Sequence, residues 1–443
     1  MNRPFPPTRL RFLPLVLAIG WGFGAQAQSL LDLYQSARGY DATYQSAKSQ
    51  FDATLAKADQ AKALLLPKAT LGLSSSRTNL ESAATATDRV YGTQTATLSG
   101  SQPLYRPADW AAYQQGIKGG ESAGAALKAA EQDLIVRLSQ AYFDVLASSD
   151  SLQFVQAQKT AVQEQLASAK RNFEVGTATI TDTREAQARY DLVLAQEISA
   201  DNDLRVKSLA LVQLAGLPTV QPKPVAAPIA LMDVTPNDVN AWVAQSQLEN
   251  PALQQLQVSL EVAKLETSKA QAGHLPTLDL IGSYQATSNN GTSISTSNSG
   301  SNVSSLNLSL NIPVFAGFST QNRIRETVSL EAKARTDLEG SQRTVAQATR
   351  AAFYGVQSGL GQVKALEAAE VSSQSALDAN KLGYQVGVRI NIDVLNSQSQ
   401  LFDTKAKLAK ARYDVLVGGL KLRQATGSLK VEDLEQVNAL LAK

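Results

Sequence analysis

The sequence repeats itself once along its length, and this duplication is the feature that most constrains its fold. Segments of the first half recur in the same order in the second half, at an offset of about 210 residues. The matched segments are Leu66-Pro67 with Leu275-Pro276, Ala141-Tyr142-Phe143 with Ala352-Phe353-Tyr354, Phe173-Glu174-Val175-Gly176 with Tyr384-Gln385-Val386-Gly387, Asp182 with Asp393, and Gly216 with Gly427. A collinear series of this kind indicates a duplicated structural unit.

The N-terminus has the pattern of an export signal. Three arginines, Arg3, Arg9 and Arg11, precede an apolar stretch at residues 12–23, and Ala25-Gln26-Ala27 is a small-residue cleavage site. The apolar stretch is shorter than the roughly 20 residues that a spanning helix needs. We therefore expect a signal peptide at residues 1–27, a first repeat at residues 28–225 and a second repeat at residues 226–443.

Within each repeat the hydrophobic period changes from helical to strand-like and back. Residues 28–66 have apolar positions at three- and four-residue steps, which predicts a helix ending before Pro67. Residues 70–74 and 93–98 then alternate with period two, which predicts a β-hairpin. In the second repeat residues 277–285 and 303–311 predict another, joined by a polar loop at residues 288–302 that suits an exposed surface.

A heptad seam follows the first hairpin. Its positions are Leu134, Leu138, Ala141, Val145, Ser148, Leu152, Val155, Lys159, Val162, Leu166, Ala169 and Phe173, with only Ser148 and Lys159 polar. A helix from Pro107 to about Phe173 would be roughly 100 Å long, far beyond a globular domain. A returning helix follows the turn after Phe173, and the tract after Gly317 repeats the pattern. Each repeat is therefore predicted to contain a long antiparallel coiled-coil hairpin.

Composition excludes several classes of function. The chain has no cysteine and one histidine, His274, so disulfides, thiolate nucleophiles and clustered His or Cys metal sites are not expected. The 41 basic residues nearly balance the 39 acidic ones, and removing the three signal arginines leaves 38. This balance argues against a nucleic-acid-binding surface. With no Gly-x-Ser-x-Gly motif either, we expect neither an enzyme nor a cofactor.

The predicted strands limit how the chain can meet a membrane. Four strands with one apolar face are too few to close a membrane barrel, and open strand edges cannot face lipid. If the strands are membranous, several chains must share one barrel. The alternative is a periplasmic coiled-coil adaptor or spacer protein without a pore.

Over essentially its whole mature length the chain resembles the TolC family of outer-membrane channel-tunnels. The segments that carry the resemblance are Gly273-His274-Leu275-Pro276-Thr277-Leu278-Asp279-Leu280, residues 173–182, Gly383-Tyr384-Gln385-Val386-Gly387 and residues 392–396. The resemblance implies a mainly α fold with a small β part, built from duplicated helical hairpins and two β-hairpins per chain. It implies a homotrimer with a 12-stranded β-barrel in the outer membrane of a Gram-negative bacterium and a 12-helix periplasmic α-barrel. It also implies a mixed equatorial belt, placed here at residues 218–247 and 427–443.

The resemblance further implies a passive exit duct for drug efflux, type I protein secretion or both. Its implied partners are a periplasmic adaptor protein, an inner-membrane transporter of ABC, RND or MFS type and outer-membrane lipid. The adaptor would open the duct at its periplasmic tip.

Residue roles at the tip are also carried over from the family. Asp393 would supply the gate ring, with Asn396 standing where close relatives have a second acid, so about three charges per trimer remain instead of six. Tyr384 and Arg389 would be latch residues with Thr181 and Asp182 as partners. The adaptor-contact residues would be Val175, Gly176, Thr177, Val386, Gly387 and Val388. As alternatives, Asp182 and Asp393 could be helix N-caps, and the glycines could serve only the turns.

Overall fold

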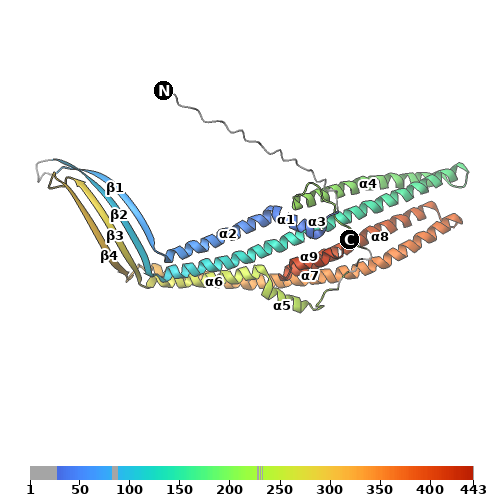
Figure 1. Cartoon of the computed structure of the whole chain (residues 1–443). Helices are drawn as coiled ribbons and strands as arrows, with labels where there is room; N and C mark the ends of the chain where they lie inside the picture. The colour runs from blue at the N-terminus through green and yellow to red at the C-terminus, as the bar shows by residue number, and fades with distance from the viewer. Residues whose placement is uncertain (1–26, 82–87, 227–228, 230, 232, 443) are drawn as a thin grey trace, which may run out of the picture.

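The computed structural model describes residues 27–81, 88–226, 229, 231 and 233–442. The predicted signal peptide lies outside the described residues except for its last position. The molecule is elongated, with a β-sheet at one end, the tips of two helical hairpins at the other, and α1, α5 and α9 near the middle (Figure 1).

The elements occur twice in the same order. The first set is α1 (Leu30–Tyr40), α2 (Ala42–Lys62), β1 (Lys68–Leu80), β2 (Arg89–Tyr105), α3 (Pro107–Glu174) and α4 (Ile180–Ala215). The second is α5 (Val239–Glu249), α6 (Pro251–Gln271), β3 (Thr277–Asn290), β4 (Asn298–Asn311), α7 (Ser319–Gln385) and α8 (Asn391–Thr426), followed by α9 (Val431–Asn438). Short 3-10 turns, Ala63–Leu65 and Ala272–His274, precede β1 and β3. The prediction of a mainly helical chain with duplicated helical hairpins and two β-hairpins is confirmed.

The first helix of each repeat is divided in two, so the prediction of one helix over residues 28–66 is wrong. Asp41 separates α1 from α2, and its carboxylate accepts a hydrogen bond from the backbone N–H of Tyr44 at 2.8 Å. Asn250 has the same place between α5 and α6, and its side-chain oxygen accepts from the N–H of Ala252 at 3.0 Å. A side chain that caps a new helix offers backbone donors a partner outside the preceding helix, so the chain can turn here.

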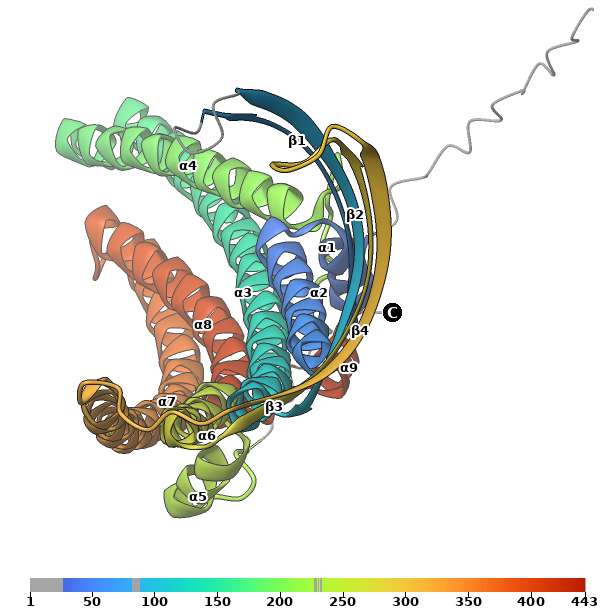
Figure 2. The same ribbon diagram turned by 90° about the vertical axis from the view of Figure 1, so that its left-hand side faces the viewer.

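The four strands form one antiparallel sheet in the order β1-β2-β3-β4. All four are longer than predicted, and the loop between β3 and β4 shrinks to residues 291–297. The register pairs Leu71 with Leu98 and Leu98 with Tyr284, so apolar side chains share one face. The other face is polar, where the hydroxyls of Thr70 and Ser99 lie 2.7 Å apart. The sheet is strongly curved (Figure 2).

Two polar positions that interrupt the predicted heptad seam of α3 have partners on α4. The hydroxyl of Ser148 donates to the Asp203 carboxylate at 2.9 Å. Lys159 forms an ion pair with Glu197, with the nearest atoms 2.6 Å apart. These contacts satisfy the polar groups of the buried Ser148 and the half-buried Lys159, so the seam continues past them without a break in the helix.

The largest buried apolar cluster among the described residues lies at the middle of the molecule, where α1 and α9 pack against α3 and α8. Tyr142 and Phe143 are completely or almost completely buried there, and the Phe143 ring stacks on Tyr413 of α8 with centroids 5.6 Å apart. The buried Gln132 amide donates to the carbonyl oxygens of Gly427 and Leu429, at 2.8 and 2.9 Å. This core fixes the C-terminal segment against α3.

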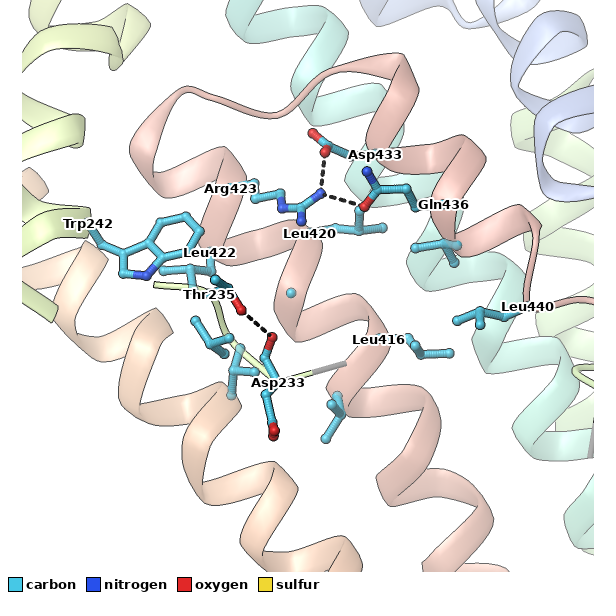
Figure 3. Close-up of a pocket in the computed structure, with 15 residues that line it drawn as sticks. Asp233, Thr235, Trp242, Leu416, Leu420, Leu422, Arg423, Asp433, Gln436 and Leu440 are labelled. Carbon is cyan, nitrogen blue, oxygen red and sulfur yellow. Dashed lines mark hydrogen bonds and ion pairs between the residues drawn. The ribbon is translucent and has the colours of Figure 1, made fainter. Parts of the chain in front are cut away.

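A small cavity of about 220 Å³ lies beside this core, between α5, α7, α8 and α9 (Figure 3). Its walls include Trp242, Leu416 and Leu420, and an ion pair between Arg423 and Asp433 closes one side. The cavity is mostly apolar.

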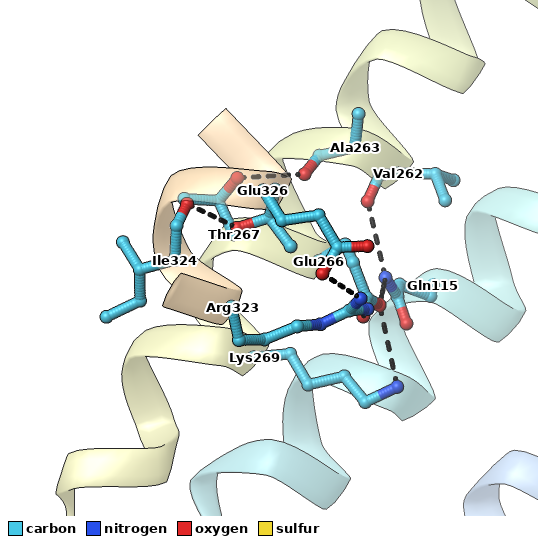
Figure 4. A network of polar contacts seen from close by, with 10 residues as sticks. Gln115, Val262, Ala263, Glu266, Thr267, Lys269, Arg323, Ile324 and Glu326 are labelled. Atoms are coloured by element: carbon cyan, nitrogen blue, oxygen red, sulfur yellow. Dashed lines mark hydrogen bonds and ion pairs between the residues drawn. The ribbon is translucent and has the colours of Figure 1, made fainter. Parts of the chain in front are cut away.

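Nearer the sheet, a polar network joins α3, α6 and α7 (Figure 4). Glu266 of α6 accepts hydrogen bonds from Gln115 of α3 at 2.9 Å and from Arg323 of α7 at 2.6 Å. The Gln115 amide and the neighbouring cations hold the pKa of the Glu266 carboxyl below its usual range. The network ties the two repeats together at this level.

No helix in the described part of the chain is long and apolar enough to cross a membrane.

Candidate functional site at the helical tips

The two hairpin tips have the same turn. In the first, the backbone N–H of Thr177 donates to the Asn172 carbonyl at 2.8 Å, and in the second the N–H of Val388 donates to the Gly383 carbonyl at 2.8 Å. Gly176 and Gly387 occupy the left-handed position of each turn, with φ of 78° and 76°. Residues with a β-carbon disfavour this conformation, so the turn itself accounts for both glycines.

Apolar side chains project from both turns. Val175, Val386 and Val388 are all largely exposed, and Thr177 is exposed beside them. Exposed valines at a hairpin end do not contribute to a core within this chain. The structure therefore leaves the predicted adaptor-contact residues accessible at the end of the molecule (Figure 1).

Asp182 has a structural partner within the first tip. The backbone N–H and the hydroxyl of Thr179 donate to the Asp182 carboxylate at 2.9 and 2.8 Å, and the N–H of Asp182 donates back to the Thr179 hydroxyl oxygen at 3.2 Å. This is a capping box, with Thr179 as the N-cap and Asp182 as the third helical residue. Asp182 thus supports the start of α4, although it is not the N-cap itself. Thr181 is exposed beside it.

Asp393 has the matching position in the second tip, as the third residue of α8. The N-cap there is Ile390, whose side chain has no polar group, so Asp393 is neither the N-cap nor part of a capping box. Its carboxylate is 3.7 Å from the guanidinium of Arg389, one turn away. The Arg389 side chain is 57% exposed, and its stem lies over Gly383. The pair faces solvent, and its Coulomb energy is correspondingly small.

Three side-chain hydrogen bonds join the two hairpins at the tips. Tyr384 and Asn396 were singled out from the sequence, and their partners were not. The Asn172 amide donates to the Tyr384 hydroxyl oxygen at 3.4 Å, and the Arg189 guanidinium donates to the Asn396 side-chain oxygen at 2.6 Å. Gln165 donates to the side-chain oxygen of Asn391. The predicted latch residue Tyr384 therefore reaches the first hairpin, at Asn172.

Within one chain the structure does not bring Tyr384 or Arg389 onto the side chains of Thr181 and Asp182. The latch role of these four residues, and the gate role of Asp393 and Asn396, stay predictions. The contacts of Asn172 and Arg189 could not be read from periodicity, because they join residues more than 200 positions apart that belong to different hairpins.

The contact between the hairpins continues away from the tip along α3 and α8. The Gln158 amide donates to the Ser399 hydroxyl oxygen at 3.2 Å, and the Tyr413 hydroxyl donates to the Asp150 carboxylate at 2.7 Å. Burial raises the pKa of Asp150, and the hydrogen bond from Tyr413 opposes that shift. Burial also raises the pKa of Tyr413. Toward the tip the seam between hairpins combines these hydrogen bonds with the apolar packing of Leu395 against the first hairpin, and toward the middle it becomes aromatic.

The described residues include no group of three or more His, Asp or Glu side chains placed to hold a metal ion. The tips hold instead exposed apolar side chains, a solvent-facing ion pair and hydrogen bonds between hairpins. Exposed apolar side chains of this kind can bind another protein.

The chain is similar to known proteins over most of its length. The family model for outer membrane efflux proteins matches residues 33–217 and 242–428. The chain is 32% identical over 438 residues to the outer membrane protein TolC of Vibrio cholerae, covering 97% of this chain and 98% of that protein. It is 30% identical over 423 residues to the alkaline protease secretion protein AprF of Pseudomonas aeruginosa, covering 94% and 88%.

The same fold is found in a solved structure. The crystal structure of the outer membrane protein VceC from Vibrio cholerae matches with a TM-score of 0.78 at 18% identity, covering 90% of this chain and 96% of that one.

Proposed function

The chain belongs to the outer membrane efflux protein family, and from this premise we propose that three copies assemble into one exit duct across the periplasm and the outer membrane. The protein is an outer-membrane channel-tunnel for efflux and type I secretion. The alternative of an adaptor or spacer without a pore is not favoured, because the relatives match over nearly the full chain, strands included.

The sheet supports assembly from several copies. Its strands alternate in direction, so β1 of one copy is antiparallel to β4 of the next and can pair with it. Both edges would otherwise carry unpaired backbone groups, which cannot face lipid. Three copies give twelve strands in one closed sheet, with the leucine face toward lipid and the Ser and Thr face toward the pore.

The tips supply the proposed gate. In three copies Asp393 would contribute three carboxylates to the entrance, and a ring of carboxylates favours cations. Asn396 adds no charge, and its side-chain oxygen is already bound by Arg189. Arg389, Tyr384, Thr181 and Asp182 would hold the entrance closed through contacts within and between copies.

The exposed valines of the two turns are the proposed contact with a periplasmic adaptor. An adaptor that binds the separated tips more tightly than the closed ones would shift the equilibrium toward the open duct, by its difference in affinity. The transporter behind it would be of ABC, RND or MFS type. The relative AprF is a protease secretion protein, which favours a secreted protein as one class of cargo beside small drugs.

The single observation that carries the proposal is the four-stranded sheet with one apolar and one polar face and two free edges. The test is the mass of the protein extracted from membranes in mild detergent, measured by native mass spectrometry. We expect outer-membrane fractionation and a particle of three chains that dissociates on heating. A protein that stays in the aqueous fraction as a single chain would refute the proposal.

A further inference from the structure

Asn391, the first residue of α8, is the side chain on which the two hairpins meet at the tip. It is completely buried. Its side-chain oxygen accepts a hydrogen bond from Gln165 of α3, and its amide donates to the backbone carbonyl of Asp182 in α4 at 3.4 Å. The amide of Asn391, at the start of α8 in the second hairpin, thus contacts both helices of the first hairpin.

We propose that Asn391 is a positioning residue of the gate, an amide clasp that holds the second hairpin of each chain against the first while the entrance is closed. This inference rests on the proposed channel function and adds a residue to its regulation. While the hairpins are in contact, the oxygen and the nitrogen of the buried Asn391 amide both have hydrogen-bond partners. Separating the hairpins breaks both hydrogen bonds at once.

The apolar side chains around Asn391 divide between the two hairpins. Leu395, one turn further along α8, is completely buried in the cluster formed by Val162, Leu166 and Ala186 of the first hairpin. Val394, next to it, packs instead with residues of its own hairpin, α7 and α8. The first turns of α8 are therefore docked on both sides, and the face bearing Asn391 and Leu395 is the one that must leave the first hairpin.

A second hydrogen bond flanks the clasp on the exposed side. The Arg189 guanidinium of α4 donates to the Asn396 side-chain oxygen at 2.6 Å. Asn396 is exposed, whereas Asn391 is buried, so the two amides differ in what an added charge would do. A carboxylate at position 396 would stay hydrated and face Arg189. A carboxylate at position 391 would be desolvated and would meet the Asp182 carbonyl oxygen without a proton to donate.

This difference gives a matched pair of variants. Asn391→Asp and Asn396→Asp each replace an amide of α8 by a carboxylate of nearly the same shape and add the same charge to the entrance. Acidic residues are favourable in the first turn of a helix, so Asn391→Asp keeps the helix while opposing the closed contact. Separation of the hairpins returns the charge introduced at position 391 to water, so only this variant favours the open entrance.

The first readout is labelling at position 395. The chain has no cysteine, so a single Leu395→Cys reports whether the buried face of α8 is exposed, independently of any conductance. With a maleimide probe on the membrane-embedded protein, we expect labelling to be at least about tenfold faster with Asn391→Asp than with the native asparagine. Asn396→Asp is expected to leave the rate unchanged or lower it.

The second readout is conductance in planar bilayers. Both variants add a charge at the proposed gate and are expected to change its ion selectivity, so Asn396→Asp controls for charge alone. Only Asn391→Asp is expected to raise the open fraction. Equal labelling in the two variants, or no change with Asn391→Asp, would overturn the clasp. Gln165→Ala, at a half-buried position on the other side of the bond, gives a smaller increase and keeps the test decisive if Asn391→Asp does not assemble. A Leu395→Cys protein with the native Asn391 that labels slowly but never conducts would overturn the channel function and leave the clasp standing.

Discussion

The glycines at the ends of α4 and α8 allow a graded test of how the end of each returning helix packs against the first helices of its repeat. Gly427 has φ of 80°, and a β-carbon added there would lie 2.6 Å from the Asn250 Cα and nearer still to the Glu249 carbonyl oxygen. Gly216, its counterpart in the first repeat, has φ of 69°, and its β-carbon would lie 2.6 Å from Cδ1 of the Tyr40 ring. Each returning helix thus ends against the point where the first helix of its repeat is divided.

The cost of alanine can be worked out at three positions. Left-handed backbone costs a residue with a β-carbon about 1–2 kcal/mol. At Gly387 that is the whole cost, because nothing lies within 4 Å of the added carbon. At Gly216 the added carbon meets Tyr40, which is 61% exposed and can swing into solvent. At Gly427 it meets backbone atoms that cannot move alone, which adds roughly 1–3 kcal/mol of overpacking.

The expected order of stability is therefore Gly387→Ala, then Gly216→Ala, then Gly427→Ala as the least stable. The assay is loss of helical circular dichroism on heating the assembled protein in detergent at one scan rate, because such proteins often unfold irreversibly. Gly387→Ala is the matched control, with the same substitution and the same sign of φ. If Gly427→Ala unfolded at the same temperature as Gly387→Ala, the packing of α8 against the α5–α6 junction would be refuted.

Three further predictions concern charged groups. Asp393→Asn should lower the cation preference of the pore, read as a reversal potential closer to zero in a salt gradient; an unchanged potential would remove Asp393 from the gate. Tyr413→Phe should destabilise the protein by about 1–3 kcal/mol, because the half-buried Asp150 carboxylate then loses its hydrogen-bond donor. Asp150→Asn keeps an acceptor for the Tyr413 hydroxyl, so it should cost less in the same melting assay. The Arg137 guanidinium lowers the pKa of the Asp41 carboxyl, so the folded state binds a proton at Asp41 less readily than the unfolded chain. The ionised Asp41 therefore stabilises the fold above the ordinary pKa of about 3.9, and this stabilisation is lost as pH falls through the lower pKa of the folded state. Asp41→Asn should accordingly flatten the fall in melting temperature below about pH 4.

The large elements could be predicted because each depends on a local pattern. The heptad seam from Leu134 to Phe173 specifies the part of α3 nearer the tip, and the alternation in β3 and β4 specifies which face is apolar. Even the seam breaks at Ser148 and Lys159 did not interrupt the helix, since Asp203 and Glu197 of the returning helix satisfy them.

The division of the first helices was not predicted, although one of the two carries a signal. Asn250 followed by Pro251 is a typical N-cap and first helical residue, and the duplication would then have transferred the break to Asp41 in the first repeat. At Asp41 alone, apolar positions at helical spacing continue on both sides and conceal the turn.

The contacts between the tips were beyond prediction for a different reason. From the sequence, Asn391 looks like a solvent-exposed residue at the start of a helix. It is buried with two hydrogen-bond partners only because Gln165 and Asp182, more than 200 residues away in the chain, lie against it. Resemblance to the family points to Arg389 and Asp393, which here form a partly exposed pair. Burial and hydrogen bonding distinguish the two kinds of residue, and neither can be read from spacing.

The most direct test of the central claim is the single-channel conductance of the purified protein in a planar lipid bilayer. A channel-tunnel assembled from three copies predicts discrete, uniform conductance steps, with a low level that reflects the closed tip. Protein that leaves the bilayer resistance unchanged, although it is folded and assembled, would contradict the claim that this chain forms a duct.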